Sequence, residues 1–269
     1  MENKRYLSCI PNQTQTMKEH QIITLNEQNI QEEHICCAFT NKNCAEGYQA
    51  KKDWLSQQFK DGYTFKKFDI RGKVFIEYVP AEKGWVPIVA PNYMLINCFW
   101  VSGKYKGNGL GTQLYQACLD DAKSKDGLVV VTAKKKQPFM SEKKFFRKHG
   151  FELCDTALPY FELWYKPFHP KAAVPKFKAC AKEGICDQKE GLVVYYTNAC
   201  PFTEYYTNVE LAKAAEKRGI PLHIQKLATK EQAQNHFVPH TIYSIFYQGK
   251  FVTQQMLTDK SFEKYIKEV

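Results

Sequence analysis

A glycine-rich turn between an apolar segment and an amphipathic one constrains the fold of this chain most strongly. Residues 93–101 (YMLINCFWV) form an apolar run with the length of a buried strand, and residues 109–124 repeat apolar side chains at helical spacing. Between them lie Gly107, Gly109 and Gly111. Glycines let the backbone approach a ligand closely, and the exposed amides at a helix start attract anions. The pattern therefore predicts a strand, an anion-binding turn and a helix.

Further strands and helices are predicted before and after this strand-turn-helix unit in the sequence. Strands are predicted at 21–25, 64–69, 73–79 and 127–133 and as a pair within 151–168, and helices at 29–39, 47–59 and 141–150. Alternating apolar strands and amphipathic helices of this kind are typical of a mixed β-sheet flanked by helices. We therefore expect an α/β domain over residues 21–168, preceded by a loose, polar tail at 1–20.

A second, smaller pattern follows residues 169–190, a stretch with prolines, several lysines and little periodicity that we interpret as a linker. Its predicted elements are a strand at 192–196, a helix at 203–218, a strand at 222–225, a short helix at 230–236, a hairpin of 242–247 and 251–255, and a final helix capped by Thr258 or Asp259. Residues 191–269 are thus expected to form a second α/β domain.

Composition excludes several classes of protein. An apolar fraction of 44% argues against disorder, and no apolar run approaches the ~18 residues of a membrane-spanning helix. The first residues lack the apolar stretch of a secretory signal, so we expect a cytoplasmic location in which the ten cysteines are mostly free thiols. The net charge of +10 is spread over both halves and forms no basic arm, so we expect neither a nucleic-acid nor a membrane partner.

Two common phosphate-binding patterns do not fit the glycine-rich turn. A Walker loop requires Gly-Lys-Ser/Thr, which is absent, and the dinucleotide pattern G-x-G-x-x-G fails because the sixth position from Gly107 is Thr112. The turn instead resembles the pyrophosphate-binding motif of the GNAT superfamily of N-acetyltransferases, Arg/Gln-x-x-Gly-x-Gly/Ala after a strand. Here it reads Lys106-x-x-Gly109-x-Gly111, with Lys replacing Arg or Gln. The alternative is a strand-to-helix turn whose glycines serve packing only.

The resemblance covers roughly residues 21–168, where FFRKHGFE matches the family's helix ending in Gly-Phe. More narrowly, the segments EEHICCAF, KVFIEYVPAEKGW, NCFWVSGKYKGNGLG and PYFEL resemble two-domain acetyltransferases with a YoaP-like C-terminal domain. This resemblance implies an enzyme that moves an acetyl group from acetyl-CoA to an amine of a small molecule or peptide.

The resemblance also implies roles for particular residues. The backbone of Phe99, Trp100 and Val101 would bind the acetyl carbonyl and the pantetheine arm where two parallel strands diverge. The pyrophosphate would be bound by Lys106, Gly107, Asn108, Gly109, Leu110, Gly111 and Thr112. Amide donors aided by a helix dipole suit a diphosphate and need no metal.

The proton-transfer residues depart from the family pattern. The position of the usual glutamate is Leu95, and that of the usual tyrosine acid is Phe146. Glu77 is the best replacement base, because burial among the apolar residues of strand 73–79 would raise its pKa; the alternative is a buried carboxylate paired with a lysine. Tyr78 and Tyr160 are candidate proton donors or packing residues, and Cys98 is a candidate covalent relay or a small core residue.

In the second domain, TNACPFTEYYTN places Cys200 after a strand and at a helix start, a position that lowers a thiol pKa. Cys-Pro-Phe-Thr resembles the active-site turn of glutaredoxin and thioredoxin relatives, with Thr203 in place of the resolving cysteine and Thr241 near the usual cis-proline position. Two alternative functions thus stay open, a non-catalytic acyl-CoA-binding module and a thiol-redox protein acting through Cys200. The cysteine and histidine spacings match no zinc pattern, and we expect no metal.

Overall fold

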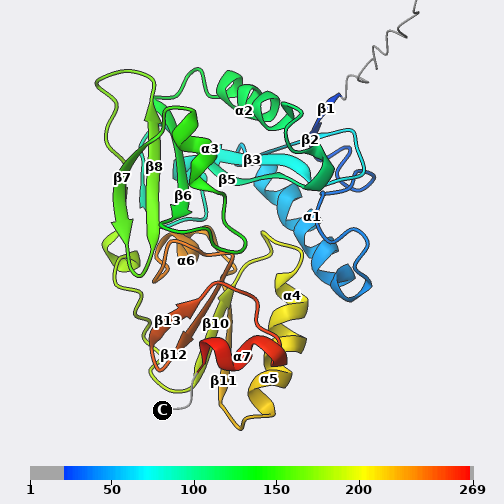
Figure 1. Ribbon diagram of the computed structural model, residues 1–269, viewed down its shortest axis with the longest axis vertical. Coiled ribbons are helices and arrows are strands. Elements are labelled where there is room, and N and C mark those ends of the chain that lie inside the picture. The colour runs from blue at the N-terminus through cyan, green and yellow to red at the C-terminus, as the bar shows by residue number, and fades with distance from the viewer. Residues whose placement is uncertain (1–20, 267–269) are drawn as a thin grey trace, which may run out of the picture.

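Two β-sheets, packed one against the other, organise the chain (Figure 1). The computed structural model describes residues 21–266, and the predicted tail at 1–20 lies outside them. The larger sheet has seven strands in the order β1-β2-β3-β5-β6-β8-β7. Its strands are β1 (Ile22–Leu25), β2 (Thr64–Phe68), β3 (Val74–Pro80), β5 (Tyr93–Val101), β6 (Gly127–Ala133), β7 (Glu152–Ala157) and β8 (Phe161–Pro167).

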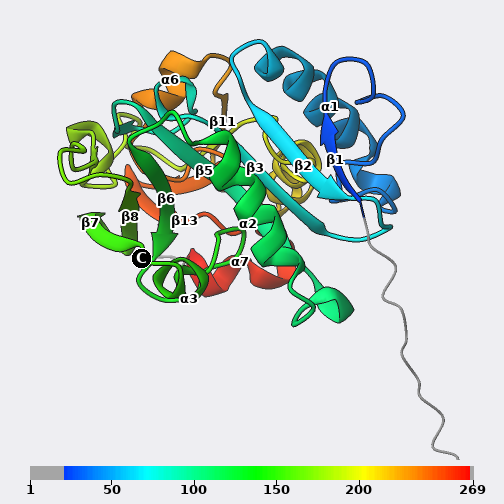
Figure 2. The same ribbon diagram turned by 90° about the horizontal axis from the view of Figure 1, so that it is seen from above.

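Helices cover both faces of this sheet. Helix α1 (Ala45–Phe59) buries Trp54 and Leu55 on one face, in a cluster with residues of β2, β3 and β5. Helices α2 (Leu110–Asp121) and α3 (Lys143–Lys148) pack on the other face, where α2 crosses over the strands (Figure 2). The side chains of β3 alternate between the two faces: Val74, Ile76 and Tyr78 face α2, whereas Phe75 and Val79 face α1.

The smaller sheet has four strands in the order β11-β10-β12-β13, in which β10 and β11 are parallel and the other pairs antiparallel. The strands are β10 (Leu192–Tyr196), β11 (Leu222–Lys226), β12 (Tyr243–Tyr247) and β13 (Lys250–Thr253). Its helices are α4 (Thr203–Tyr205), which continues through a π-helical turn (Tyr206–Leu211) into α5 (Ala212–Glu216), then α6 (Lys230–Gln234) and α7 (Asp259–Tyr265).

One apolar core continues from the larger unit into the smaller one. Val193, Ala199, Val238 and Phe246 of the smaller unit join the same buried cluster as α1 and the α1-facing side of the larger sheet. The opposite face of the smaller sheet packs on α5 and α7 in a core of its own. Burial of apolar surface therefore holds the two units together.

The segment 169–190 is fastened to both units. Within it, β9 (Lys176–Phe177) pairs with β4 (Ile88–Val89) of the first unit, and Ile185 forms a bridge with Lys250 of the second. The Asp155 carboxylate accepts a hydrogen bond from the Phe177 amide at 2.8 Å. The segment predicted as a linker is thus docked along much of its length.

The helix predicted at 29–39 is wrong. The structure has turns there, because the side chains of Asn26 and Asn29 accept hydrogen bonds from nearby backbone amides and compete with helical pairing. Cys36 and Ala38 adopt positive φ angles of 64° and 58°, which an α-helix cannot contain. The loop instead directs the intervening Cys37 towards the interior. No helix among residues 21–266 has the length and apolar character needed to cross a bilayer.

Candidate active site between the two sheets

The parallel strands β5 and β6 diverge part-way along their length. They pair from Tyr93 opposite Gly127 to Ile96 opposite Val130, and the register ends there. A bulge at Asn97 shifts the register between β5 and β3 at the same point, and such bulges bend a strand and increase its twist. Beyond it, β5 stays paired with β3 and β6 with β8. The facing edges of β5 and β6 thus open into a V with backbone groups along its sides.

The glycine-rich turn follows directly from the end of β5. A short 3-10 turn (Gly103–Tyr105) leads to Gly109, which caps α2 with a φ of 74°. A Cβ added at Gly107 or Gly109 would meet no atom within 4 Å, so the space in front of the turn is open. The first amides of α2 have no intrahelical acceptor and point outwards from the helix start. The predicted pyrophosphate-binding residues, 106–112, therefore surround an open helix N-terminus beside the V.

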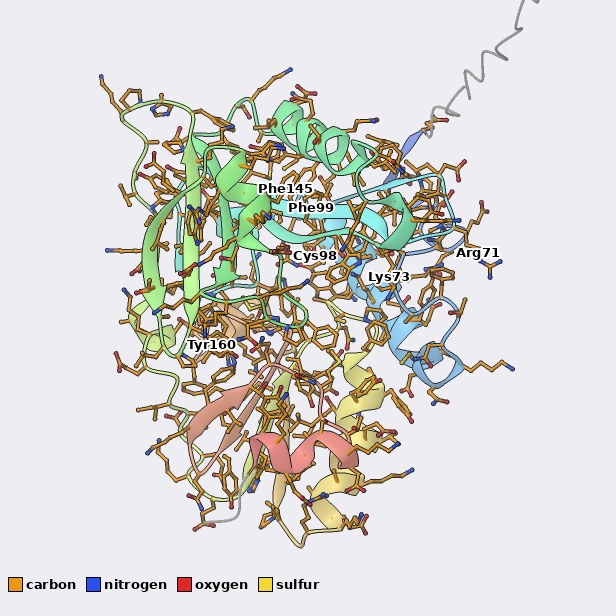
Figure 3. The ribbon with its side chains drawn as sticks, viewed as in Figure 1. Arg71, Lys73, Cys98, Phe99, Phe145 and Tyr160 are labelled. Atoms are coloured by element: carbon orange, nitrogen blue, oxygen red, sulfur yellow. The ribbon has the colours of Figure 1, made fainter. Side chains whose placement is uncertain are left out.

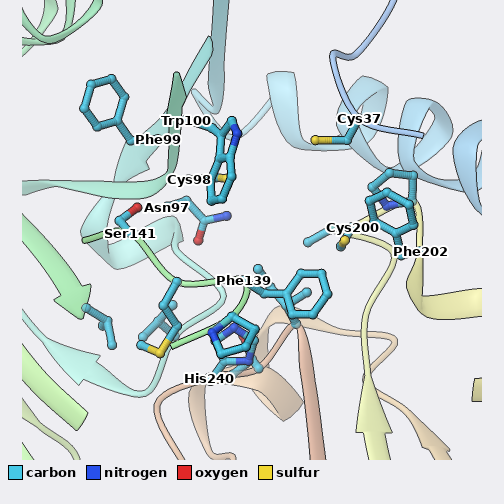
Figure 4. A pocket seen from close by; sticks show the side chains of 18 of the residues that line it. Cys37, Asn97, Cys98, Phe99, Trp100, Phe139, Ser141, Cys200, Phe202 and His240 are labelled. Atoms are coloured by element: carbon cyan, nitrogen blue, oxygen red, sulfur yellow. The ribbon is translucent and has the colours of Figure 1, made fainter. Parts of the chain in front are cut away.

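A cavity of about 540 Å³ lies where the V meets the smaller unit (Figure 4). Both units contribute its walls: β5 presents Asn97, Cys98 and Trp100, and the smaller unit presents Cys200 and Phe202. The remaining lining residues are Cys37, Lys51, Lys73, Phe75, Val86, Leu95, Ile96, Phe99, Val131, Pro138, Phe139, Met140, Ser141, Ala199, Pro201, Tyr206, Pro239, His240, Thr241, Ile242, Gln255 and Met256. A cavity of this size suits a small-molecule ligand.

Glu77, the predicted base, is fully buried and does not line the cavity. Its carboxylate accepts hydrogen bonds from Lys51 Nζ and from the Tyr63 hydroxyl, each at 2.6 Å. Asn97 Nδ2 in turn donates to the Tyr63 hydroxyl at 2.9 Å. Burial is the largest single influence on the pKa of Lys51 and lowers it, but Glu77 and the nearby Cys37 and Cys98 together raise this pKa above its usual value, so the ammonium stays charged. Glu77 is thus a buried carboxylate paired with a lysine, which was the alternative to its role as the base. Two members of its hydrogen-bond network, Lys51 and Asn97, line the cavity.

The two candidate tyrosines are engaged elsewhere. The Tyr78 hydroxyl donates to Asp121 on α2 at 2.5 Å, on the opposite face of the sheet from the cavity, so its assignment as a proton donor is wrong. Tyr160 donates to Gln254 and does not line the cavity. At the positions of the family's usual proton-transfer residues, Leu95 lines the cavity and Phe146 is buried between α2 and the sheet.

Three thiols face the cavity, from Cys37, Cys98 and Cys200 (Figure 4). Burial raises the pKa of Cys98 well above its usual range and that of Cys200 to about 12, although the backbone of Phe202 lowers the latter in part. The prediction that Cys200 is activated at a helix start is therefore wrong, because desolvation outweighs the helix. All three groups are thiols at neutral pH.

His240 is the residue that the sequence did not single out. It lines the cavity, its side chain is only 7% exposed, and its Nδ1 lies 2.9 Å from the carbonyl oxygen of Tyr243. Since a carbonyl only accepts, Nδ1 carries the hydrogen, and Nε2 holds a lone pair without a partner in the described structure. Burial lowers the pKa of His240, so the ring is neutral at pH 7. The thioredoxin resemblance placed the neighbouring Thr241 opposite the Cys200 turn, and the same reasoning could have identified His240 as a residue near that turn.

A second, smaller depression of about 310 Å³ follows β6. The lysine run 134–136 reaches it, and Lys135, Lys136 and Arg147 line it together with residues of α3.

Among residues 21–266, no group of three or more His, Cys, Asp or Glu side chains is placed to hold a metal ion.

Comparison with known proteins identifies two families along the chain. Residues 28–151 match the acetyltransferase (GNAT) family, and residues 221–264 match the YoaP-like family. A Bacillus subtilis (strain 168) protein, the uncharacterized N-acetyltransferase YoaP, is 41% identical over 246 residues, which span 91% of this chain and 97% of the relative.

Solved structures of acetyltransferases are more distant matches to this chain. A GNAT-family acetyltransferase from Staphylococcus aureus Mu50 aligns with 55% of this chain and 99% of its own, at 16% identity and a TM-score of 0.39. A Bacillus anthracis protein solved in complex with acetyl coenzyme A aligns with 40% of this chain at 20% identity and a TM-score of 0.32, and the match spans 64% of that protein.

Proposed function

Because the chain belongs to the GNAT acetyltransferases, as a relative of the N-acetyltransferase YoaP, we propose that it transfers an acetyl group from acetyl-CoA to an amine bound in the cavity between the two sheets. One observation carries this proposal. The V between β5 and β6 lies between an open, glycine-lined helix start and a cavity that is partly open to solvent, and residues of β5 line this cavity. A long anionic donor and a small acceptor can therefore meet at the point of divergence.

The residues of the turn fit a diphosphate. The amides of residues 107–112 would bind its oxygens and Lys106, which is exposed beside them, would balance its charge. The free backbone edge of Phe99, Trp100 and Val101 would hold the pantetheine arm and bind the thioester oxygen as negative charge develops on it. Acetyl-CoA, when bound, supplies the activated acetyl group.

We assign the removal of the amine proton to His240. His240 lines the cavity, and the hydrogen bond from Nδ1–H to Tyr243 leaves the buried, unpartnered Nε2 as the ring nitrogen that can accept a proton. Glu77 then serves as a positioning residue, holding Lys51 and, through Tyr63, Asn97. Cys98 serves as a small wall residue at the bulge.

The smaller unit supplies part of the acceptor site. Its strand order and the Cys200 turn facing Thr241 support a thioredoxin-like architecture for residues 191–269, joined by 169–190 to an acetyltransferase domain over 21–168. The raised pKa of Cys200 argues against a thiol-redox role, so the unit acts here as a cavity wall rather than as a redox centre.

Gly109→Val tests the donor site. A valine at a φ of 74° is strained and places a side chain where the diphosphate would bind. We expect the Kd for acetyl-CoA, measured by calorimetry, to rise at least tenfold. Gly219→Val is the matched control, since Gly219 also has a positive φ and open space but lies in the smaller unit at the end of α5. Equal affinities of the two variants would contradict this donor site.

His240→Gln tests the base. General-base catalysis contributes roughly 10²–10⁴-fold, so kcat should fall about 100-fold while the Kd for acetyl-CoA stays within twofold. Because burial lowers the pKa of His240, the wild-type kcat should hold until the pH drops below the usual histidine range, and the variant should lose that acidic limb. The exposed His223, changed in the same way, is the control. A kcat above half the wild-type value would exclude His240 as the base.

A further inference from the structure

We propose that the acceptor is an amine with an aromatic or apolar body and an anionic group, and that Lys73 binds this anionic group. The inference rests on the proposed function and names the substrate class of the same cavity. It follows from the charges and the exposed rings that the cavity presents.

The cavity wall carries positive but no negative side chains. None of the described lining residues is Asp or Glu, and the two charged ones are Lys51 and Lys73. Lys51 is neutralised by Glu77 at 2.6 Å. No described carboxylate lies within 4.0 Å of Lys73 Nζ, and the centroid of the Phe202 ring lies 5.8 Å from this atom. One cation in a partly desolvated site is thus left without a counter-charge, and an anionic ligand group would supply it.

The position of Lys73 suits this role. Its carbonyl accepts a hydrogen bond from the Ser102 amide at 2.9 Å, which ties its backbone to the end of β5. Figure 3 marks where Lys73 lies in the fold. Its side chain lies on the same side of the strand as Phe75, towards the cavity rather than towards α2. The ammonium therefore borders the acceptor side of the V, and Phe202 of the smaller unit faces it.

Aromatic rings form the rest of the acceptor wall. Trp100 and Phe139 line the cavity and are still 41% and 42% exposed, unusually much for large apolar side chains beside an interior space. Phe139 is held there by a backbone with a φ of 60°, a conformation that costs energy for a bulky residue and often marks a functional site. These rings suit a flat or apolar ligand body.

The same wall disfavours polycationic acceptors. Polyamines and aminoglycosides keep several ammonium groups, which require carboxylates in a binding site, and this wall offers Lys73 instead. An amine with a nearby carboxylate has no such conflict, because its anionic group meets Lys73 and it brings a single ammonium group into the cavity.

Three acceptors separate these classes in an assay of acetylated product by mass spectrometry. L-Phenylalanine has the ring, the amine and the carboxylate, phenethylamine lacks only the carboxylate, and spermidine is a polycation. We expect wild-type kcat/KM for phenylalanine to exceed that for phenethylamine at least tenfold, as a charge-assisted hydrogen bond to an ammonium would give. Lys73→Met should reduce this ratio to below threefold, and Lys213→Met, an exposed lysine on α5 outside the cavity, should keep it.

A binding measurement without turnover separates this inference from the proposed function. N-acetylphenylalanine should bind at least tenfold more tightly than N-acetylphenethylamine, and Lys73→Met should remove the difference. If that holds while no acceptor is acetylated, the acceptor class stands and the catalytic function fails. If spermidine is the preferred acceptor, or if Lys73→Met leaves both ratios unchanged, the acceptor class is wrong.

Discussion

Glu77→Gln is expected to lower the free energy of unfolding by about 3–5 kcal/mol, because it leaves a buried charge without a partner. Lys51 Nζ is 2.6 Å from Glu77, and both side chains are almost completely inaccessible to water. A glutamine amide still accepts one hydrogen bond but provides no counter-charge. Urea denaturation at pH 7.5, followed by circular dichroism, measures the loss.

A double variant separates the charge from the packing. Replacing both partners, with Lys51→Met and Glu77→Leu, removes the unpaired charge and should recover most of the stability lost by Glu77→Gln. The double variant should still lose catalytic activity, since Tyr63 and Asn97 lose the group that orients them. A single Glu77→Gln variant within 1 kcal/mol of the wild type would show that the pair contributes little.

Gly47→Ala is expected to destabilise the protein and impair the acceptor site, although such a change inside a helix normally stabilises by up to about 1 kcal/mol. An added Cβ at Gly47 on α1 would lie 2.3 Å from the carbonyl oxygen of Pro201 and 3.4 Å from Glu204 Cβ. Both residues belong to the smaller unit, and Pro201 lines the cavity beside Cys200. The units must therefore move apart, at a cost of roughly 1–3 kcal/mol.

Gly47→Ala should weaken binding of the acceptor more than binding of acetyl-CoA. Moving Pro201 widens the acceptor wall, so KM for the acceptor should rise about tenfold, whereas the Kd for acetyl-CoA should change less than twofold. Gln57→Ala, at an exposed position on the same helix, is the control and should change neither quantity. A Gly47→Ala protein with greater stability and unchanged acceptor KM would show that the packing of α1 on the smaller unit does not shape the site.

The sequence predicts the strands of the fold better than its loops. The apolar runs at 93–101 and 127–133 match β5 and β6 to the residue, because each is bounded by turn-forming residues and is buried on both faces over the stretch where the two strands pair. Residues 29–39 carry apolar side chains at near-helical spacing but form turns, since two asparagines and the positive φ angles of Cys36 and Ala38 override this weak periodicity.

In the candidate site, features set by the local sequence could likewise be predicted, whereas features set by the packing of distant segments could not. The glycine turn is a local feature and could be located from the sequence, and the burial of Glu77 follows from the strand pattern. Its partner Lys51 lies 26 residues away on α1, and only the packing of that helix reveals the pair. His240 reaches the cavity only because the smaller unit packs on the larger one, and the same packing buries Cys200 and raises its pKa.

The most direct test of the account is a crystal structure of the full chain with acetyl-CoA. The account predicts the diphosphate on the amides of residues 107–112, the pantetheine arm along β5 between the diverging strands, and the thioester in the cavity shared by the two units, on the side that His240 faces. A thioester outside this cavity, or a donor bound away from the glycine turn, would contradict it.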